Sequence, residues 1–197
     1  MRSIMIISFM NQKGGVGKTS VTLGVALTLE RAGERVGIID MDSQKTSTRF
    51  LYYLRANNQT NIEITTKAKG FDYVLIDTAP NLNKKQVKAA DISDRVVMVT
   101  KTAPPNLLST QETIEYMTKH CRPGLPLYLL FNHVDHRKGH AQNLEEKAAK
   151  VGGIPLPHHL SYLSDYEYLF LQGYAALGNA ARLELSQVVY DIVSTPG

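Results

Sequence analysis

The sequence contains a single cysteine, Cys121, and no tryptophan among its 197 residues. One cysteine cannot form a disulfide within the chain, and it excludes zinc and iron–sulfur sites built from the cysteines of one chain. No apolar run approaches the roughly 18 residues of a membrane-spanning helix. Residues 1–12 also lack the length and the small-residue cleavage site of a signal peptide. We therefore expect a cytoplasmic protein with no membrane segment.

Charge is modest overall and uneven along the chain. The sequence holds 22 basic and 18 acidic residues, a formal net charge of +4. Residues 1–150 carry 21 of the basic residues against 14 acidic ones, whereas residues 151–197 carry only Arg182 against four acids. A surface that binds a polyanion would therefore be built mainly by the first three-quarters of the chain.

Short apolar runs rich in Ile, Val and Leu recur along the chain, and none alternates with polar residues. This pattern is typical of strands buried on both faces, as in parallel sheets. The intervening segments are long enough for crossover helices. The expected strands are Ile4–Phe9, Val36–Ile39, Tyr73–Ile76, Val96–Val99 and Leu127–Phe131. The expected helices include Thr19–Ala32, Leu107–His120, Ala141–Val151, Tyr162–Leu171 and Ala180–Val193, followed by a frayed tail, Ser194–Gly197.

This alternation predicts an α/β fold with a doubly wound, mostly parallel sheet and helices on both faces. Neither an internal repeat nor a low-complexity linker interrupts it. We expect one domain over residues 1–197.

A glycine-rich segment follows the first expected strand and opens the first expected helix. Residues 11–20 read Asn-Gln-Lys-Gly-Gly-Val-Gly-Lys-Thr-Ser. Closely spaced glycines let backbone N–H groups turn inward and surround phosphate oxygens, and the helix adds its positive end. Lys18 would reach the β- and γ-phosphates, and the Thr19 hydroxyl would hold Mg²⁺. The alternative is a glycine-rich turn with an unrelated lysine.

Acidic residues follow the second and third expected strands. Asp40 and Asp42 come directly after Val36–Ile39, and Asp77 ends the next strand. A carboxylate at the carboxyl end of a buried parallel strand points to the edge of the sheet where ligands bind. Two acids two residues apart could serve a metal's water shell and an attacking water. The alternative for this pair is capping of the strand end by Asx turns.

One departure from the general P-loop pattern is informative. Gln12 stands where that pattern has glycine, and a second lysine, Lys13, follows it. This form resembles the deviant Walker A box of the ParA/MinD family of ATPases. The resemblance implies that Lys13 reaches across an ATP-sandwich homodimer to the partner's phosphates; the alternative is a solvated loop lysine. The expected ATP contacts are Lys13, Gly14, Gly15, Val16, Gly17, Lys18, Thr19 and Ser20, with Asn132 and Pro155 at the base.

The same resemblance assigns the acidic residues. It implies that Asp42 positions or activates the attacking water, so that Lys13, Lys18 and Asp42 form the catalytic set. Thr19, Asp40 and Asp77 would form the Mg²⁺ set, with Asp77 as the Walker B acid. Ser43 stands where the family usually has proline.

At the base, the resemblance implies that Asn132 reads adenine and that Pro155 lines its other side. An amide can both donate to and accept from the N6/N7 edge of adenine, although an Asn that turns the chain is the alternative. The segment Val99–Leu108 resembles the family's proline-containing loop near the dimer interface, or is a loop that leads into a helix.

With no helix-turn-helix segment before the P-loop, the chain is most like a short partition-type ParA. The resemblance implies ATP-dependent dimerisation, non-specific DNA binding on the nucleoid, and hydrolysis stimulated by a ParB-like centromere-binding or cargo adaptor protein. Candidate DNA-binding residues are Lys84, Lys85, Lys88, Arg137, Lys138, Lys147, Lys150 and Arg182; the alternative for these basic runs is a solvated surface.

Two other functions fit the sequence less well. A MinD-like membrane-associated ATPase would need a basic amphipathic helix near the end of the chain, and Ala180–Val193 carries one arginine against two acids. A metabolic or metallocentre enzyme on this fold, such as dethiobiotin synthetase or nitrogenase iron protein, would leave Lys13 without a role or would need cluster cysteines.

Overall fold

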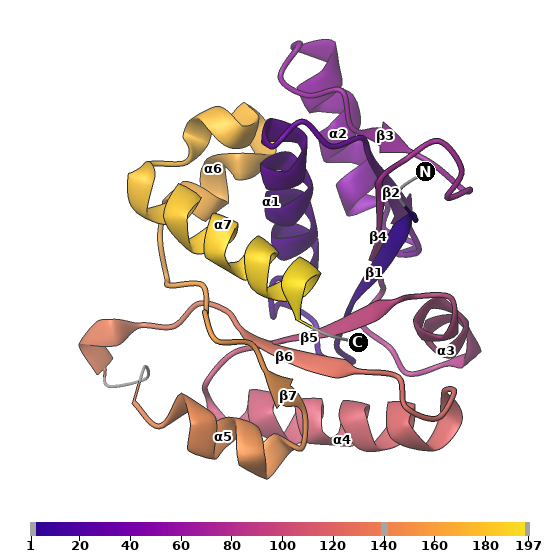
Figure 1. The fold of residues 1–197 in the computed structure, drawn as a ribbon. Coiled ribbons are helices and arrows are strands. Elements are labelled where there is room, and N and C mark those ends of the chain that lie inside the picture. Colours follow the sequence, from indigo (N-terminus) through magenta and orange to yellow (C-terminus); the bar gives the residue numbers. More distant parts are fainter. Residues whose placement is uncertain (1–2, 139–141, 196–197) are drawn as a thin grey trace.

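The computed structural model describes residues 3–138 and 142–195, and its centre is one sheet (Figure 1). Every pairing between neighbouring strands is parallel, as buried apolar runs without alternation predict. The order across the sheet is β3 (Glu63–Ile64), β2 (Val36–Asp40), β4 (Tyr73–Asp77), β1 (Met5–Met10), β5 (Arg95–Thr100), β6 (Leu127–Phe131) and β7 (Ile154–Pro155). The predicted doubly wound α/β fold is confirmed.

Helices cover both faces of the sheet (Figure 1). One face packs against α1 (Lys18–Arg31), α2 (Thr46–Ala56), α6 (Asp165–Gln172) and α7 (Asn179–Ser194). The other packs against α3 (Lys84–Asp91), α4 (Pro104–His120) and α5 (Leu144–Val151). The 3₁₀ turns η1 (His136–Lys138) and η2 (Gly173–Ala176) lie in connections. In residues 3–138 and 142–195, no helix is long and apolar enough to cross a membrane.

The structure corrects several expected boundaries. Helix α6 begins at Asp165 rather than Tyr162, because the chain before it is extended: Tyr162 N–H donates to the Val134 carbonyl at 3.0 Å. Helix α5 begins at Leu144, and residue 141, where this helix was expected to begin, lies outside the described residues. Ser194 belongs to α7 rather than to a frayed tail, and residues 196–197 lie outside the described residues.

The strand register brings the predicted site residues to one edge of the sheet. Asp77 pairs with Phe9 on one side and with Asp40 on the other. The P-loop leaves β1 at this same carboxyl edge and leads into α1. Residues far apart in the sequence therefore meet because parallel strands end together.

A buried arginine fastens the end of α7 to the sheet. Arg95, at the start of β5, is 8% exposed. Its Nε donates to the Ile192 carbonyl at 2.8 Å, and Nη2 donates to the Thr195 carbonyl. The guanidinium also lies 5.7 Å from the ring centre of Tyr128. This one side chain supplies donors for carbonyls at the end of the helix.

We predict that Arg95→Met lowers the free energy of unfolding by about 2–3 kcal/mol, because buried carbonyls lose charged donors. Urea unfolding of the nucleotide-free protein measures the change. Arg35→Met is the control, since Arg35 pairs with Asp72 with 68% of its side chain exposed; its effect should be clearly smaller. Equal effects of the two substitutions would show that Arg95 does not hold α7.

Candidate functional site

The P-loop holds its glycines in conformations that other residues rarely adopt. Gly15 and Gly17 have φ angles of 73° and 98°. A Cβ at Gly17 would lie 2.2 Å from Nδ2 of Asn132, so the loop also needs glycine for close approach. Within the described chain, the amides of Gly14, Gly15 and Gly17 donate to no acceptor. Unpaired donors on an open loop are the groups that bind phosphate oxygens.

The first residues of the loop are tied to α4 across the sheet. Asn11 is buried, and its Nδ2 donates to the Val99 carbonyl at 2.9 Å and to Thr110 Oγ1 at 2.8 Å. Its Oδ1 accepts from the Lys13 amide at 2.9 Å. Gln12 Nε2 also donates to Glu112 on α4. These contacts fix the loop before its glycines begin.

Lys18 lies inside the loop and is 7% exposed. Its ammonium donates to the Lys13 carbonyl at 3.1 Å, so the side chain closes the loop upon itself. Burial lowers the pKa of Lys18, and the carboxylates of Asp77 and Asp42 oppose that effect. This buried ammonium lies near two carboxylates, and it can donate hydrogen bonds to phosphate oxygens bound at the same edge of the sheet.

Asp77 and Thr19 form the most buried part of the site. Thr19 Oγ1 donates to Asp77 Oδ2 at 2.9 Å. The other oxygen, Oδ1, is buried without a hydrogen-bond partner among the described residues, as is the hydroxyl of Ser47. Burial raises the pKa of Asp77 to about 6, although the nearby hydroxyls of Thr19 and Ser47 act in the opposite direction.

This donor set fits Mg²⁺. A hard divalent cation prefers carboxylate, hydroxyl and water oxygens, and here one carboxylate oxygen is buried without a partner among the described residues, beside two hydroxyls. A cation near Asp77 would offset the unfavourable burial of its charge. The predicted assignment of Thr19, Asp40 and Asp77 to Mg²⁺ remains a prediction, and this physical support concerns Thr19 and Asp77.

Asp40 is the last residue of β2, and Asp42 lies on the connection from β2 to α2. Both oxygens of Asp40 are engaged: Oδ1 accepts from the Asp42 amide at 3.0 Å, and Oδ2 accepts from the Thr48 amide at 3.0 Å and from its hydroxyl. Asp42 Oδ1 accepts from the Gln44 amide at 2.9 Å. These are the Asx turns that the sequence left open as the alternative for the pair. Asp40 holds the connection, while half-buried Asp42 lies near Lys18.

Lys13 differs from Lys18 in its surroundings. It is half-buried. Its amide and carbonyl are both bonded within the loop, yet its ammonium makes no hydrogen bond or ion pair in the described part of the chain. Val16 is buried and its carbonyl accepts from Asn132, whereas Ser20 is half-buried in the first turn of α1.

The residues predicted at the base take different positions. Asn132 is 2% exposed, and its Nδ2 donates to the Val16 carbonyl at 2.8 Å. Its observed contact is thus with the P-loop itself, which it ties to β6. Pro155 is exposed on β7, opposite Leu129. Adenine contacts by Asn132 and Pro155 remain predictions. The segment at 99–108 leads into α4, which begins at Pro104.

The candidate DNA-binding lysines and arginines lie on separate elements. Lys84, Lys85 and Lys88 are exposed on α3. Arg137 pairs with Asp135 at 3.0 Å, and Lys150 pairs with Glu146 at 2.7 Å. Lys147 Nζ donates to the Gln142 carbonyl. Lys138 lies in η1, and Arg182 lies in the first turn of α7. The DNA-binding role of these residues remains a prediction.

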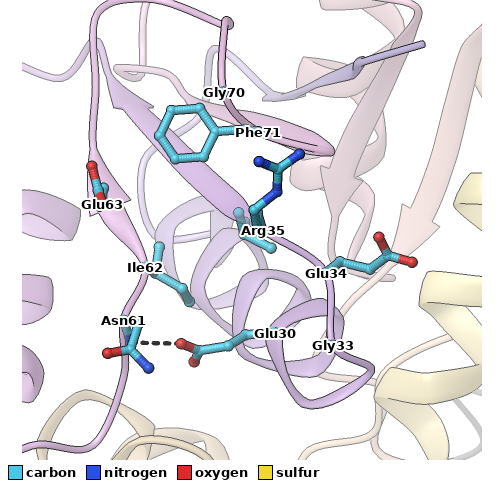
Figure 2. Close-up of a pocket in the computed structure, with 10 residues that line it drawn as sticks. Glu30, Gly33, Glu34, Arg35, Asn61, Ile62, Glu63, Gly70 and Phe71 are labelled. Carbon is cyan, nitrogen blue, oxygen red and sulfur yellow. Dashed lines mark hydrogen bonds between the residues drawn. The ribbon is translucent and has the colours of Figure 1, made fainter. Parts of the chain in front are cut away.

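The hollow of about 320 Å³ in Figure 2 lies away from this site, at the amino ends of β2 and β3. Several of its polar side chains have partners within the chain. Glu30 accepts from the Asn61 amide (dashed in Figure 2) and from the Thr60 hydroxyl, and Arg35 pairs with Asp72. These contacts connect α1 to the edge of the sheet, and the hollow is separate from the P-loop site.

Sequence reasoning missed several residues that shape the site. Asn11 binds partners 88 and 99 positions away, so no local pattern marks it. Thr48 binds Asp40 from the first turn of α2, a helix outside the expected set. No sequence pattern marks the neighbouring Ser47 either.

These features define a P-loop nucleotide-binding domain: a parallel sheet, a glycine loop between β1 and α1, and acids at the ends of the neighbouring strands. Residues 7–170 match the family model described as the CobQ/CobB/MinD/ParA nucleotide binding domain, and the chain belongs to this family.

Relatives extend the comparison. The chain is 30% identical over 160 residues to maintenance of carboxysome distribution protein A of Gloeobacter kilaueensis, covering 76% of this chain and 73% of that one. In fold, it is similar to a candidate plasmid partition protein of Borrelia burgdorferi bound to AMPPNP (TM-score 0.77, 18% identity, 98% and 99% covered). It is also similar to pNOB8 ParA bound to nonspecific DNA (TM-score 0.71, 18% identity, 98% and 100% covered).

We predict that Asp77→Asn stabilises the nucleotide-free protein at pH 7 by up to about 3 kcal/mol. A pKa raised from 3.8 to about 6 means that the folded state binds the proton more tightly, so stability falls as pH rises through that window. The substitution removes the buried charge, and its benefit should vanish below pH ~4, where both states are protonated. Urea unfolding at pH 7 and at a pH of about 4 measures this; an equal effect at both pH values would contradict it.

Proposed function

We propose that this protein is a Mg²⁺-dependent ATPase that dimerises on ATP, binds DNA without sequence preference and hydrolyses ATP to position a plasmid, chromosome or other cargo. The proposal rests on the different surroundings of two lysines in one loop. Lys18 is buried against its own loop, whereas the ammonium of Lys13 has no partner in the described chain. A P-loop enzyme that acts alone needs only the first.

ATP binding is supported by the open amides of Gly14, Gly15 and Gly17 together with buried Lys18. When bound, Mg²⁺ would supply charge neutralisation between phosphates. Thr19 and Asp77 would hold it or its waters through the buried oxygens that already lie together. Asp42 would orient and deprotonate the attacking water through its second oxygen, while Oδ1 holds the turn to Gln44.

A homodimer would place Lys13 of each protomer near the phosphates of the ATP bound by its partner. Two triphosphates brought face to face repel one another, and at an effective dielectric constant of about 20 that repulsion reaches several kcal/mol. Lys13 of each protomer would reach the phosphates of the partner's ATP and cancel this charge. ATP would thus be required to form the dimer, and hydrolysis would release it.

The cellular role is inferred from the relatives. One acts in carboxysome distribution by its name, one structure is of a candidate partition protein, and one is of a ParA on nonspecific DNA. We infer a cytoplasmic, nucleoid-associated ATPase whose hydrolysis is stimulated by a ParB-like or cargo adaptor protein. The membrane-associated alternative has less support, because α7 presents Arg182 as its one basic residue beside Glu184 and Asp191.

We predict that Asp42→Ala binds ATP and accumulates as a DNA-bound dimer while hydrolysing ATP ~10²–10⁴-fold more slowly. The substitution removes the group that orients water but no phosphate contact. Size exclusion and sedimentation with DNA, each with ATP or ADP, would be combined with a phosphate-release assay. Lys18→Gln is the control that should bind no ATP and form no dimer. Turnover at the wild-type rate in Asp42→Ala would show that another group orients the water.

A further inference from the structure

An arginine-lined hollow lies at the end of α1 that is remote from the P-loop. The ring of Tyr174, in η2, is in contact with two guanidinium groups: Arg31 Cζ is 5.6 Å and Arg182 Cζ is 5.1 Å from its centre. Arg31 ends α1, and Arg182 lies in the first turn of α7. The hollow measures about 270 Å³ and is lined by Arg31, Gln59, Gln172, Tyr174, Ala175 and Arg182.

The lining contains cations and amides but no carboxylate among the described residues. Neither arginine forms an ion pair in the described part of the chain, and Arg182 Nε is buried there without a hydrogen-bond partner. The neighbouring acid, Glu30, accepts from the Thr60 hydroxyl at 2.7 Å and from the Asn61 amide instead. Two unpaired cations that line one recess repel each other, and an anion bound in that recess would relieve the repulsion.

The other basic places offer less to a polyanion. Arg137 and Lys150 are paired with acids of their own chain, so an incoming phosphate would have to displace those carboxylates. Lys84 and Lys85 make no ion pair within the described residues, and they are exposed on α3 as Arg31 is exposed at the end of α1. A lysine ammonium, however, lacks the planar, paired donors with which a guanidinium binds phosphate. Among these places, the arginine hollow combines unpaired charge with a shaped recess and a rigid aromatic support.

We propose that this hollow binds a phosphodiester group of DNA, an inference that rests on the DNA binding in the proposed function. Planar guanidinium groups donate in pairs to phosphate oxygens, and the amides of Gln59 and Gln172 add neutral donors. Such contacts position the backbone without reading bases. Because Arg31 and the P-loop lie at opposite ends of α1, roughly 20 Å apart along the helix, DNA and ATP occupy separate sites on one element.

The test compares two pairs of substitutions that remove the same charge. Arg31→Gln with Arg182→Gln removes the hollow's cations, and Lys84→Gln with Lys85→Gln removes those of α3. DNA affinity is measured with ATP at several salt concentrations by fluorescence anisotropy of a labelled duplex. We expect the arginine variant to bind about tenfold or more weakly, with a salt slope shallower by ~0.9 for each phosphate that is no longer neutralised. The lysine variant should change affinity less than about threefold, roughly 0.6 kcal/mol.

A further variant protects the test against misfolding. Arg31→Lys with Arg182→Lys keeps the charge but removes the paired donors and much of the stacking on Tyr174, so we expect intermediate affinity. ATP-dependent dimerisation by size exclusion reports folding of each variant. Unchanged DNA affinity in a dimerising arginine variant, or a greater loss in the lysine variant, would overturn the hollow as the DNA site. If the wild-type protein with ATP binds no DNA even at low salt, the proposed function itself fails on this point.

Discussion

The site depends on one buried carboxylate. Asp77 is fully buried at the end of β4, where parallel strands place it beside Asp40, Thr19 and Lys18. Keeping that carboxylate ionised in low-dielectric surroundings costs free energy, and Oδ1, which has no partner among the described residues, shows that the chain does not fully compensate for it. The fold therefore holds a charge whose natural complement is a cation, and the glycine loop lies directly beside it. The buried charge lowers stability in the nucleotide-free protein, and a bound cation would offset that cost.

The P-loop is anchored at both ends while its middle stays open. Asn11 ties it to β5 and α4, and Asn132 ties it to β6 through the Val16 carbonyl. Between these anchors the amides of three glycines remain unpaired within the described chain. A loop that is already ordered loses little conformational entropy when phosphate binds. The α1 helix then connects this loop to the far end, where Arg31 meets Tyr174 and Arg182.

The sequence predicted those elements that a local residue pattern marks. Buried strands such as β5 show as apolar runs, and the glycine loop shows as a motif, so the fold and the phosphate site could be predicted. Short edge strands such as β3 have no such run, and α2 has only Leu51 and Leu54 fully buried among its apolar residues. The anchors of Asn11 and Asn132, and the stacking of Arg31 on Tyr174, join residues that lie far apart in the sequence. These contacts follow from the tertiary fold and could not be predicted from the sequence alone.

In the proposed function Lys13 acts across a dimer, and mixing two variants tests this role most directly. Lys13→Gln should bind ATP yet remain a monomer, because each triphosphate loses the partner's cation. Mixed with Asp42→Ala, it should form heterodimers in part, since one of the two sites in each heterodimer keeps its trans lysine. Analytical ultracentrifugation with ATP, with one variant fluorescently labelled, measures both species. If Lys13→Gln alone dimerises on ATP as the wild-type protein does, the cross-dimer role of Lys13 is wrong.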